Sequence, residues 1–240
     1  MIGLGNSIQF SSSYQFEPTD VSSLALWLKN GAGVATNQWD DSSGNDNHAI
    51  QNTEGNRAAT DGGGLDFERD NSQFYNLTSK IDIADNGGFC VAVVVTRESE
   101  VAGCLLSDGS NELFQFQNAT TLRIKTLNSS ATVTTTDVVL PAGTFATGSK
   151  LILLTNRSAG ANNKFSFFKN GSALTADTDT SSNEAAGENP GGIEFSILGS
   201  RTGGSNYFDG IIHEVLVWNK GLDATEIAEV NSYLKEIHGL

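Results

Sequence analysis

The sequence predicts an all-β fold, a two-sheet antiparallel jelly-roll sandwich closed by one C-terminal α-helix. Short apolar segments alternate with turns rich in glycine and asparagine, which supply the positive φ angles of tight corners. Apolar residues make up 38% of the 240 residues and charged residues only 18%. Many brief strands joined by such turns are typical of sandwiches and jelly rolls.

The first element is an extended N-terminal arm over residues 1–18. Ile8, Phe10, Tyr14 and Phe16 recur at even positions, with polar residues between them, which is strand periodicity. Such an arm pairs either with its own sheet or with a neighbouring subunit, and the sequence leaves both open. The jelly-roll domain then occupies residues 19–240, a length that a single sandwich commonly reaches.

The strands follow as apolar runs between turn signals such as SGNDN, DGGG and ENPGG. Trp27, Trp39 and Trp218 lie in apolar strand contexts and are expected in the core. The expected strands cover residues 24–29, 89–96, 112–117, 121–127, 150–156, 164–170, 194–200 and 210–218.

One helix is predicted, over residues 223–238. Asp223 and Glu226 have the spacing of a capping box, which satisfies free N–H groups at a helix start. Apolar residues then recur at helical spacing, and Gly239 follows as a stop signal. This apolar stripe is at positions Ile227, Val230, Leu234 and Ile237.

The two cysteines, Cys90 and Cys104, flank a polar stretch centred near Arg97. If that stretch is a hairpin turn, a cross-strand disulfide is conceivable, but two cysteines in a chain of this length are not a disulfide framework. Buried free thiols are the favoured state.

The formal net charge of −14 argues against nucleic acid and anionic membrane surfaces as partners, because the average field repels both. The opening residues MIGLGNSIQF have no basic residue before an apolar run, so a Sec signal peptide is not predicted. No apolar segment approaches transmembrane length.

Four stretches, in this order and spacing, resemble the concanavalin A-like lectin/glucanase superfamily, close to its laminin-G-like branch. The resemblance implies a jelly roll, with the closing strand and helix in the fourth stretch. Asp46 stands where the family usually has glycine. The stretches are EPTDVSSLALWLK (17–29), WDDSSGNDNHAIQ (39–51), FSFFKNGSAL (165–174) and LGSRTGGSNYFDGIIHEVLVWNKGLDATEIAEVNSYL (198–234).

A calcium site is the cofactor hypothesis. The loop after Trp39 is dense in oxygen donors, which calcium prefers, and the resemblance implies a calcium ion near this motif. Glu214, in a strand with apolar neighbours, needs a cation or hydrogen bonds to offset burial, whereas His213 is expected on the opposite face. The alternative is that these residues only cap the turn and accept backbone N–H bonds. The candidate ligands are Asp41, Asn45, Asn47 and Glu214.

Sugar binding requires an exposed aromatic ring beside polar groups. Tyr207, in GGSNYF, and Tyr75 are the candidates. Catalysis is not expected: the Glu-x-Asp-x-x-Glu strand of glucanases does not occur, and neither does a Gly-x-Ser-x-Gly or His-Glu-x-x-His motif.

The favoured function is a non-catalytic structural or adhesive bacteriophage virion protein, a capsid decoration, tail or fibre component. The chain resembles the stand-alone lectin-like domains of phage particles, and its arm suits docking to other virion proteins or self-association. The alternative is a carbohydrate-binding module of a bacterial surface or secreted protein, bound to a cell-surface glycan. The expected location is the virion, or in the alternative the outside of a bacterium.

Overall fold

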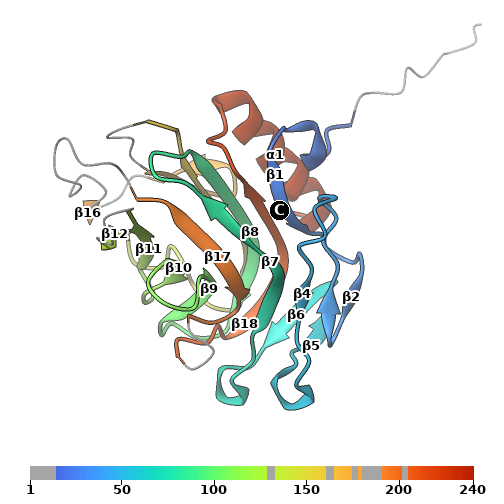
Figure 1. Ribbon diagram of the computed structural model, residues 1–240. Helices are drawn as coiled ribbons and strands as arrows, with labels where there is room; N and C mark the ends of the chain where they lie inside the picture. The colour runs from blue at the N-terminus through green and yellow to red at the C-terminus, as the bar shows by residue number, and fades with distance from the viewer. Residues whose placement is uncertain (1–14, 129–132, 161–164, 175–177, 180–190, 202–204) are drawn as a thin grey trace, which may run out of the picture.

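Two antiparallel sheets face each other, and one helix covers the outer side of one of them (Figure 1). The computed structural model describes residues 15–128, 133–160, 165–174, 178–179, 191–201 and 205–240. The all-β jelly-roll prediction is confirmed. The eight expected strands coincide with β1, β8, β10, β11, β13, β14, β17 and β18.

The first sheet has eight strands, and β18 lies at its centre. One side of β18 pairs with β8, while its other side pairs with β6 at the start and β1 at the end. The strands, in order across the sheet, are β15 (Ser172–Ala173), β14 (Phe165–Lys169), β13 (Lys150–Arg157), β8 (Phe89–Arg97), β18 (Gly210–Trp218), then β1 (Leu24–Leu28) beside β6 (Gly64–Phe67) and β5 (Ala59–Asp61).

The second sheet has ten strands and joins segments from most of the chain. One short 3-10 turn, Pro18–Asp20, precedes β1, and two more, Glu54–Asn56 and Arg69–Asn71, lie between strands. In order the strands are β16 (Thr178–Asp179), β12 (Val133–Val139), β11 (Thr121–Leu127), β10 (Leu113–Phe116), β9 (Gly103–Ser107), β17 (Ile193–Leu198), β7 (Tyr75–Ile83), β4 (Ala49–Ile50), β3 (Gln38–Trp39) and β2 (Val34–Ala35).

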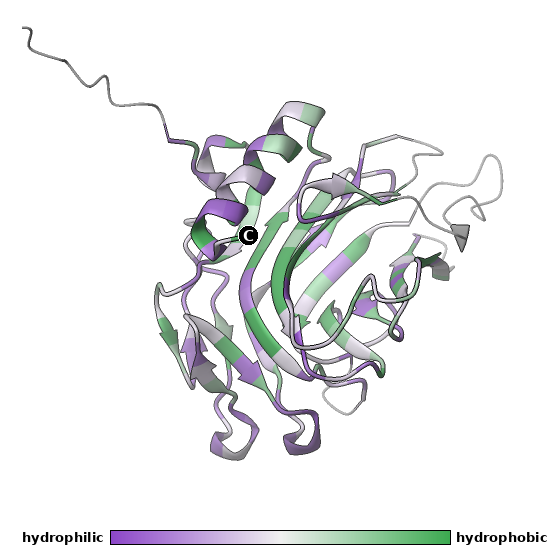
Figure 2. Ribbon diagram, turned by 180° about the vertical axis from the view of Figure 1, so that it is seen from behind, coloured by the Kyte–Doolittle hydropathy of each residue, from purple (hydrophilic) through white to green (hydrophobic). Residues whose placement is uncertain are grey.

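The main core lies between the two sheets, because alternate residues of each strand point inward. Phe67, Phe116 and Phe208 pack against one another there, with ring centroids 6.4 Å apart in each contact to Phe208. Figure 2 shows hydrophobic residues along the strands and hydrophilic ones at the outer turns. Trp39 and Trp218 are fully buried, so the predicted core positions of the tryptophans are confirmed.

A second core lies between the first sheet and helix α1 (Ala224–His238). Asp223 and Glu226 form the predicted capping box, and Gly239 ends the helix at φ +67°. Val230 and Leu234 are buried on the sheet, but Ile237 is 44% exposed, so the apolar stripe is shorter than predicted. This helix is too short to span a bilayer, and no helix in the described part of the chain is long and apolar enough to do so.

The end of the predicted arm contacts the same helix. Residues 1–14 of the arm lie outside the described residues, which begin at Gln15. The ring of Phe16 meets that of Tyr233 edge to face, with centroids 6.3 Å apart. Residues 15–18 therefore lie beside the C-terminal helix of their own chain.

Candidate functional site

The carboxylate of Asp41 organises the turn that sequence analysis proposed as a calcium loop. Oδ1 accepts hydrogen bonds from the backbone N–H groups of Trp27 (2.8 Å) and Ser43 (2.9 Å). Oδ2 accepts from Ser43 Oγ (2.7 Å) and from the N–H of Asn47 (3.0 Å). All four bonds are made within the protein, so Asp41 fits the alternative in which it caps the turn.

The two asparagines attach this turn to β1. The amide of Asn45 donates to the carbonyl of Leu24 at 2.8 Å, and that of Asn47 donates to the carbonyl of Ala25, also at 2.8 Å. Asp46 between them has φ +57°, the left-handed conformation that glycine adopts most easily and aspartate tolerates. Asp46 therefore keeps the turn that the family makes with glycine.

Glu214 does not join this turn. It is fully buried, Oε1 accepts from Trp27 Nε1 at 2.7 Å, and Oε2 lies 2.7 Å from His238 Nε2. The prediction of Glu214 as a fourth ligand beside Asp41 is therefore corrected, because its two oxygens are occupied beneath the helix. The four residues do not form one cation site, and calcium binding stays a prediction.

His213 lies on the same face as Glu214, not on the opposite one. A β-bulge between Ile212 and Glu214 inserts one residue and interrupts the strand alternation. The ring of His213 consequently lies 6.1 Å from that of His238. Burial lowers the pKa of His213 to about 4, and electrostatic repulsion from Lys150 and His238 adds to this effect.

Tyr75 is not an exposed ring, and its prediction as a sugar-binding residue is wrong. It is 0% exposed, its hydroxyl donates to the carbonyl of Thr36 (2.7 Å) and accepts from the N–H of Ala58 (3.0 Å). Burial raises its pKa to about 12. The reason is register: Tyr75 begins β7 on its inward-facing side and packs edge to face on Phe67.

Tyr207 is half-buried, in the segment that follows β17. It lies between Phe208, which belongs to the core, and Asn206, whose amide lies 3.4 Å from Gln115 Oε1. This places Tyr207 beside the outer face of the ten-stranded sheet, the face turned away from the core.

A row of amides crosses that outer face. Phe114 and Phe116 belong to the core, so Gln115 between them points outward. Gln115 Nε2 donates to Gln117 Oε1 at 2.6 Å, and Gln115 Oε1 receives the amide of Asn206. Gln115 itself is only 2% exposed and uses both of its amide groups within the row, so the half-buried amides of Gln117 and Asn206 are the ones that a ligand can reach.

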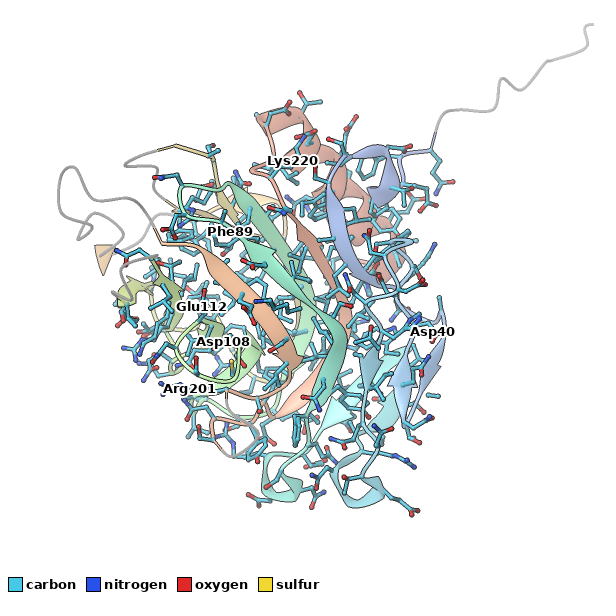
Figure 3. All side chains as sticks on the ribbon, viewed as in Figure 1. Asp40, Phe89, Asp108, Glu112, Arg201 and Lys220 are labelled. Atoms are coloured by element: carbon cyan, nitrogen blue, oxygen red, sulfur yellow. The ribbon has the colours of Figure 1, made fainter. Side chains whose placement is uncertain are left out.

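Charged side chains surround the row. Gln115 pairs across the sheet with Arg123, whose guanidinium makes a bidentate bond to Asp137 with distances of 2.6 and 2.7 Å. Lys125 lies two residues along β11 and therefore shares the face of Arg123. Arg201 comes from the loop after β17, and Figure 3 shows it on the same side of the molecule as Asp108 and Glu112.

Asp108 and Glu112 are two adjacent carboxyls whose oxygens accept hydrogen bonds within the protein. Asp108 accepts three bonds within its own turn, from Ser110 N, Ser110 Oγ and Glu112 N. Glu112 is 8% exposed, and its Oε1 accepts from the N–H of Glu194 at 2.9 Å. Burial, followed by the charge of Asp108, raises the pKa of Glu112 to about 7.

A second polar area, a pocket beside the Asp41 turn, is the weaker candidate. It is bordered by Asn45, Asn47 and Lys80 but by no aromatic side chain of the described residues. The asparagine nitrogens already donate to β1, and Lys80 pairs with Glu194 at 2.6 Å. Its polar groups are therefore largely satisfied.

Sequence reasoning missed most of the outer face. Alternation in ELFQFQ and TLRIKTL separates inward-facing from outward-facing residues. It could therefore have identified Gln115, Arg123 and Lys125 as outward-facing. Arg201 and Asn206 reach the face through a loop, and no periodicity reports such a contact.

Comparisons with known proteins agree with this architecture. The sequence model of the family described as the concanavalin A-like lectin/glucanases superfamily matches residues 69–228. No curated protein matches the chain.

Solved structures share the fold at low identity. The binding domain of Paraclostridial Mosquitocidal Protein 1 has a TM-score of 0.57 at 12% identity, over 90% of this chain and 53% of that one. A Trypanosoma rangeli sialidase has a TM-score of 0.53 at 14% identity, over 90% of this chain and 33% of the sialidase. The receptor-binding domain of botulinum neurotoxin type G has a TM-score of 0.50 at 14% identity, over 89% of this chain and 52% of that domain. The chain thus spans between about a third and a half of these structures.

Proposed function

The chain belongs to the concanavalin A-like lectin/glucanases superfamily, and from that membership we propose that it is a carbohydrate-binding domain without a catalytic centre. The observation that carries the proposal is the pair of half-buried amides, Gln117 and Asn206, that the buried Gln115 links on the outer face of the ten-stranded sheet. A lectin-like fold alone is a weak argument for function, so the proposal depends on this face.

The chemistry of the face suits a saccharide. Sugar hydroxyls donate and accept hydrogen bonds. Amide groups both donate and accept, and a planar guanidinium group donates with fixed geometry. Tyr207, the half-buried residue that follows Asn206 in the chain, stays the aromatic candidate for this face. Binding sites of this kind orient a ligand through a few placed polar groups.

The names of the similar structures include both binding domains and sialidases. Two of them are named as binding domains, one of a mosquitocidal protein and one of a neurotoxin. The third is a sialidase, of which this chain spans only 33%. These structures show the fold alone, so the proposal of binding depends on the amides of the outer face.

A glycan array followed by calorimetry tests the proposal. Gln117→Met keeps the side-chain length but removes both hydrogen-bonding groups of a half-buried amide, and Asn206→Ala removes the other half-buried amide. Each substitution is expected to lower the affinity for the saccharide that binds best by at least about tenfold. Asn52→Ala, at an exposed asparagine outside the face, is the matched control. Absence of binding by the intact protein to every saccharide on the array would refute the proposal.

The place of action is a finer part of the same proposal. We propose a structural or adhesive component of a bacteriophage particle, with residues 1–18 as the docking arm, supported by the acidic composition and the lectin-like fold. Light scattering with and without residues 1–14 tests association through the arm. Imaging of the native particle distinguishes this role from that of a bacterial surface or secreted module.

A further inference from the structure

Two basic residues, Lys125 and Arg201, lie together on the outer face of the ten-stranded sheet, and neither forms an ion pair with an acid of the described residues. Lys125 pairs across the sheet with Leu113, and Leu113 pairs with Ser107 on the next strand. Ser107 Oγ donates to the carbonyl of Arg201 at 2.9 Å. Lys125 and Arg201 therefore flank Leu113 from its two sides.

Their positive charges are not compensated within the described part of the chain. Burial lowers the pKa of Lys125, and the charges of Arg201 and Arg123 lower it further, which only Asp137 opposes. Nε of Arg201 is buried and has no hydrogen-bond partner among the described residues. An unpaired buried donor of this kind is costly unless a ligand satisfies it.

The nearby acids are already occupied. Asp137 binds Arg123 with both carboxylate oxygens. Asp108 accepts bonds inside its own turn, and Glu112, with its pKa near 7, accepts the N–H of Glu194. The remaining positive charge is local, in a chain with only 14 basic against 28 acidic residues.

We propose that Lys125 and Arg201 bind the carboxylate of an acidic sugar, which makes the ligand an anionic saccharide. This inference rests on the proposed carbohydrate-binding function and names its ligand class. A guanidinium binds a carboxylate through two parallel N–H···O bonds, and a neighbouring ammonium adds a point charge. The amide row then contacts the hydroxyls of the same saccharide, while the acidic remainder of the surface disfavours anions elsewhere.

A matched pair of ligands tests this inference by calorimetry. Sialyllactose and lactose differ by one carboxylate-bearing sugar, and sialyllactose is expected to bind at least about tenfold more tightly. Arg201→Gln and Lys125→Met should each reduce that difference, and the double variant should remove it. Arg201→Lys should retain part of the affinity difference, because the variant keeps the positive charge but loses the two parallel N–H donors of the guanidinium.

Lys80→Met is the matched control. Lys80 lies on the same sheet, but it is already paired with Glu194, so its removal should leave the preference for sialyllactose unchanged. Melting curves establish that each variant is folded.

The outcomes separate the two proposals. Equal affinity for lactose and sialyllactose, or a preference that survives in the double variant, overturns the acidic-sugar inference and leaves carbohydrate binding intact. A sulfated lactose that binds more tightly than sialyllactose also overturns the carboxylate assignment. Failure to bind any saccharide refutes the proposed function itself.

Discussion

Trp27 Nε1 donates a hydrogen bond of 2.7 Å to Oε1 of Glu214, which lies 187 residues later in the chain. The second oxygen of Glu214 lies 2.7 Å from Nε2 of His238 in the last turn of the helix. One buried carboxylate thereby links the first strand, the last strand and the C-terminal helix.

Removal of this carboxylate should destabilise the fold. Glu214→Ala leaves the Trp27 indole N–H and the His238 ring without their acceptor, and we expect a loss of about 3 kcal/mol in the free energy of unfolding. Glu214→Gln, which keeps one acceptor, should lose less. Urea denaturation measures both. Glu229→Gln, on the exposed side of the helix, should change stability by less than about 0.5 kcal/mol.

Asp41→Asn should lower stability by about 2 kcal/mol, because the carboxylate accepts four hydrogen bonds that hold the turn on β1. Melting curves with and without a chelator distinguish this role from metal binding. We expect the variant to lose the same stability in both conditions. A chelator that lowers the melting temperature of the parent but not of Asp41→Asn would instead support calcium at this turn.

Glu112 should make stability depend on pH. Its pKa is raised to about 7 in the folded chain, above its ordinary value, so between these two values the native state holds a proton that the unfolded state has lost. Stability should therefore fall as pH rises from about 4.5 to 7. Glu112→Gln should remove this part of the pH profile, measured by denaturation at a series of pH values. An unchanged profile would contradict the assignment.

Cys90 and Cys104 should resist modification in the native protein. Both are buried free thiols on different sheets, and burial raises the pKa of each. The disulfide considered from the sequence does not form, because β8 and β9 are not hydrogen-bonded neighbours. Ellman's reagent should titrate two thiols in denaturant and neither without it. Rapid reaction of the folded protein would show that one of them is accessible.

The sequence was informative where local patterns determine structure. Asp223 and Glu226 formed their capping box because a helix start requires only neighbouring residues. Tyr75 was misassigned because alternation shows that a strand has two faces but not which of them is buried. The bulge before Glu214 depends on pairing with β8, and the approach of Arg201 depends on a loop path. Neither leaves a pattern in the local sequence.

The central position of β18 also constrains synthesis. This strand pairs with β8, β6 and β1, all of which leave the ribosome long before it. Until residues 210–218 emerge, β8 has one unpaired edge and β1 contacts only the turn around Asp41, so the nascent chain exposes strand edges that invite association. A translational pause before β18 has left the ribosome should therefore promote aggregation, whereas one after β18 has emerged should not.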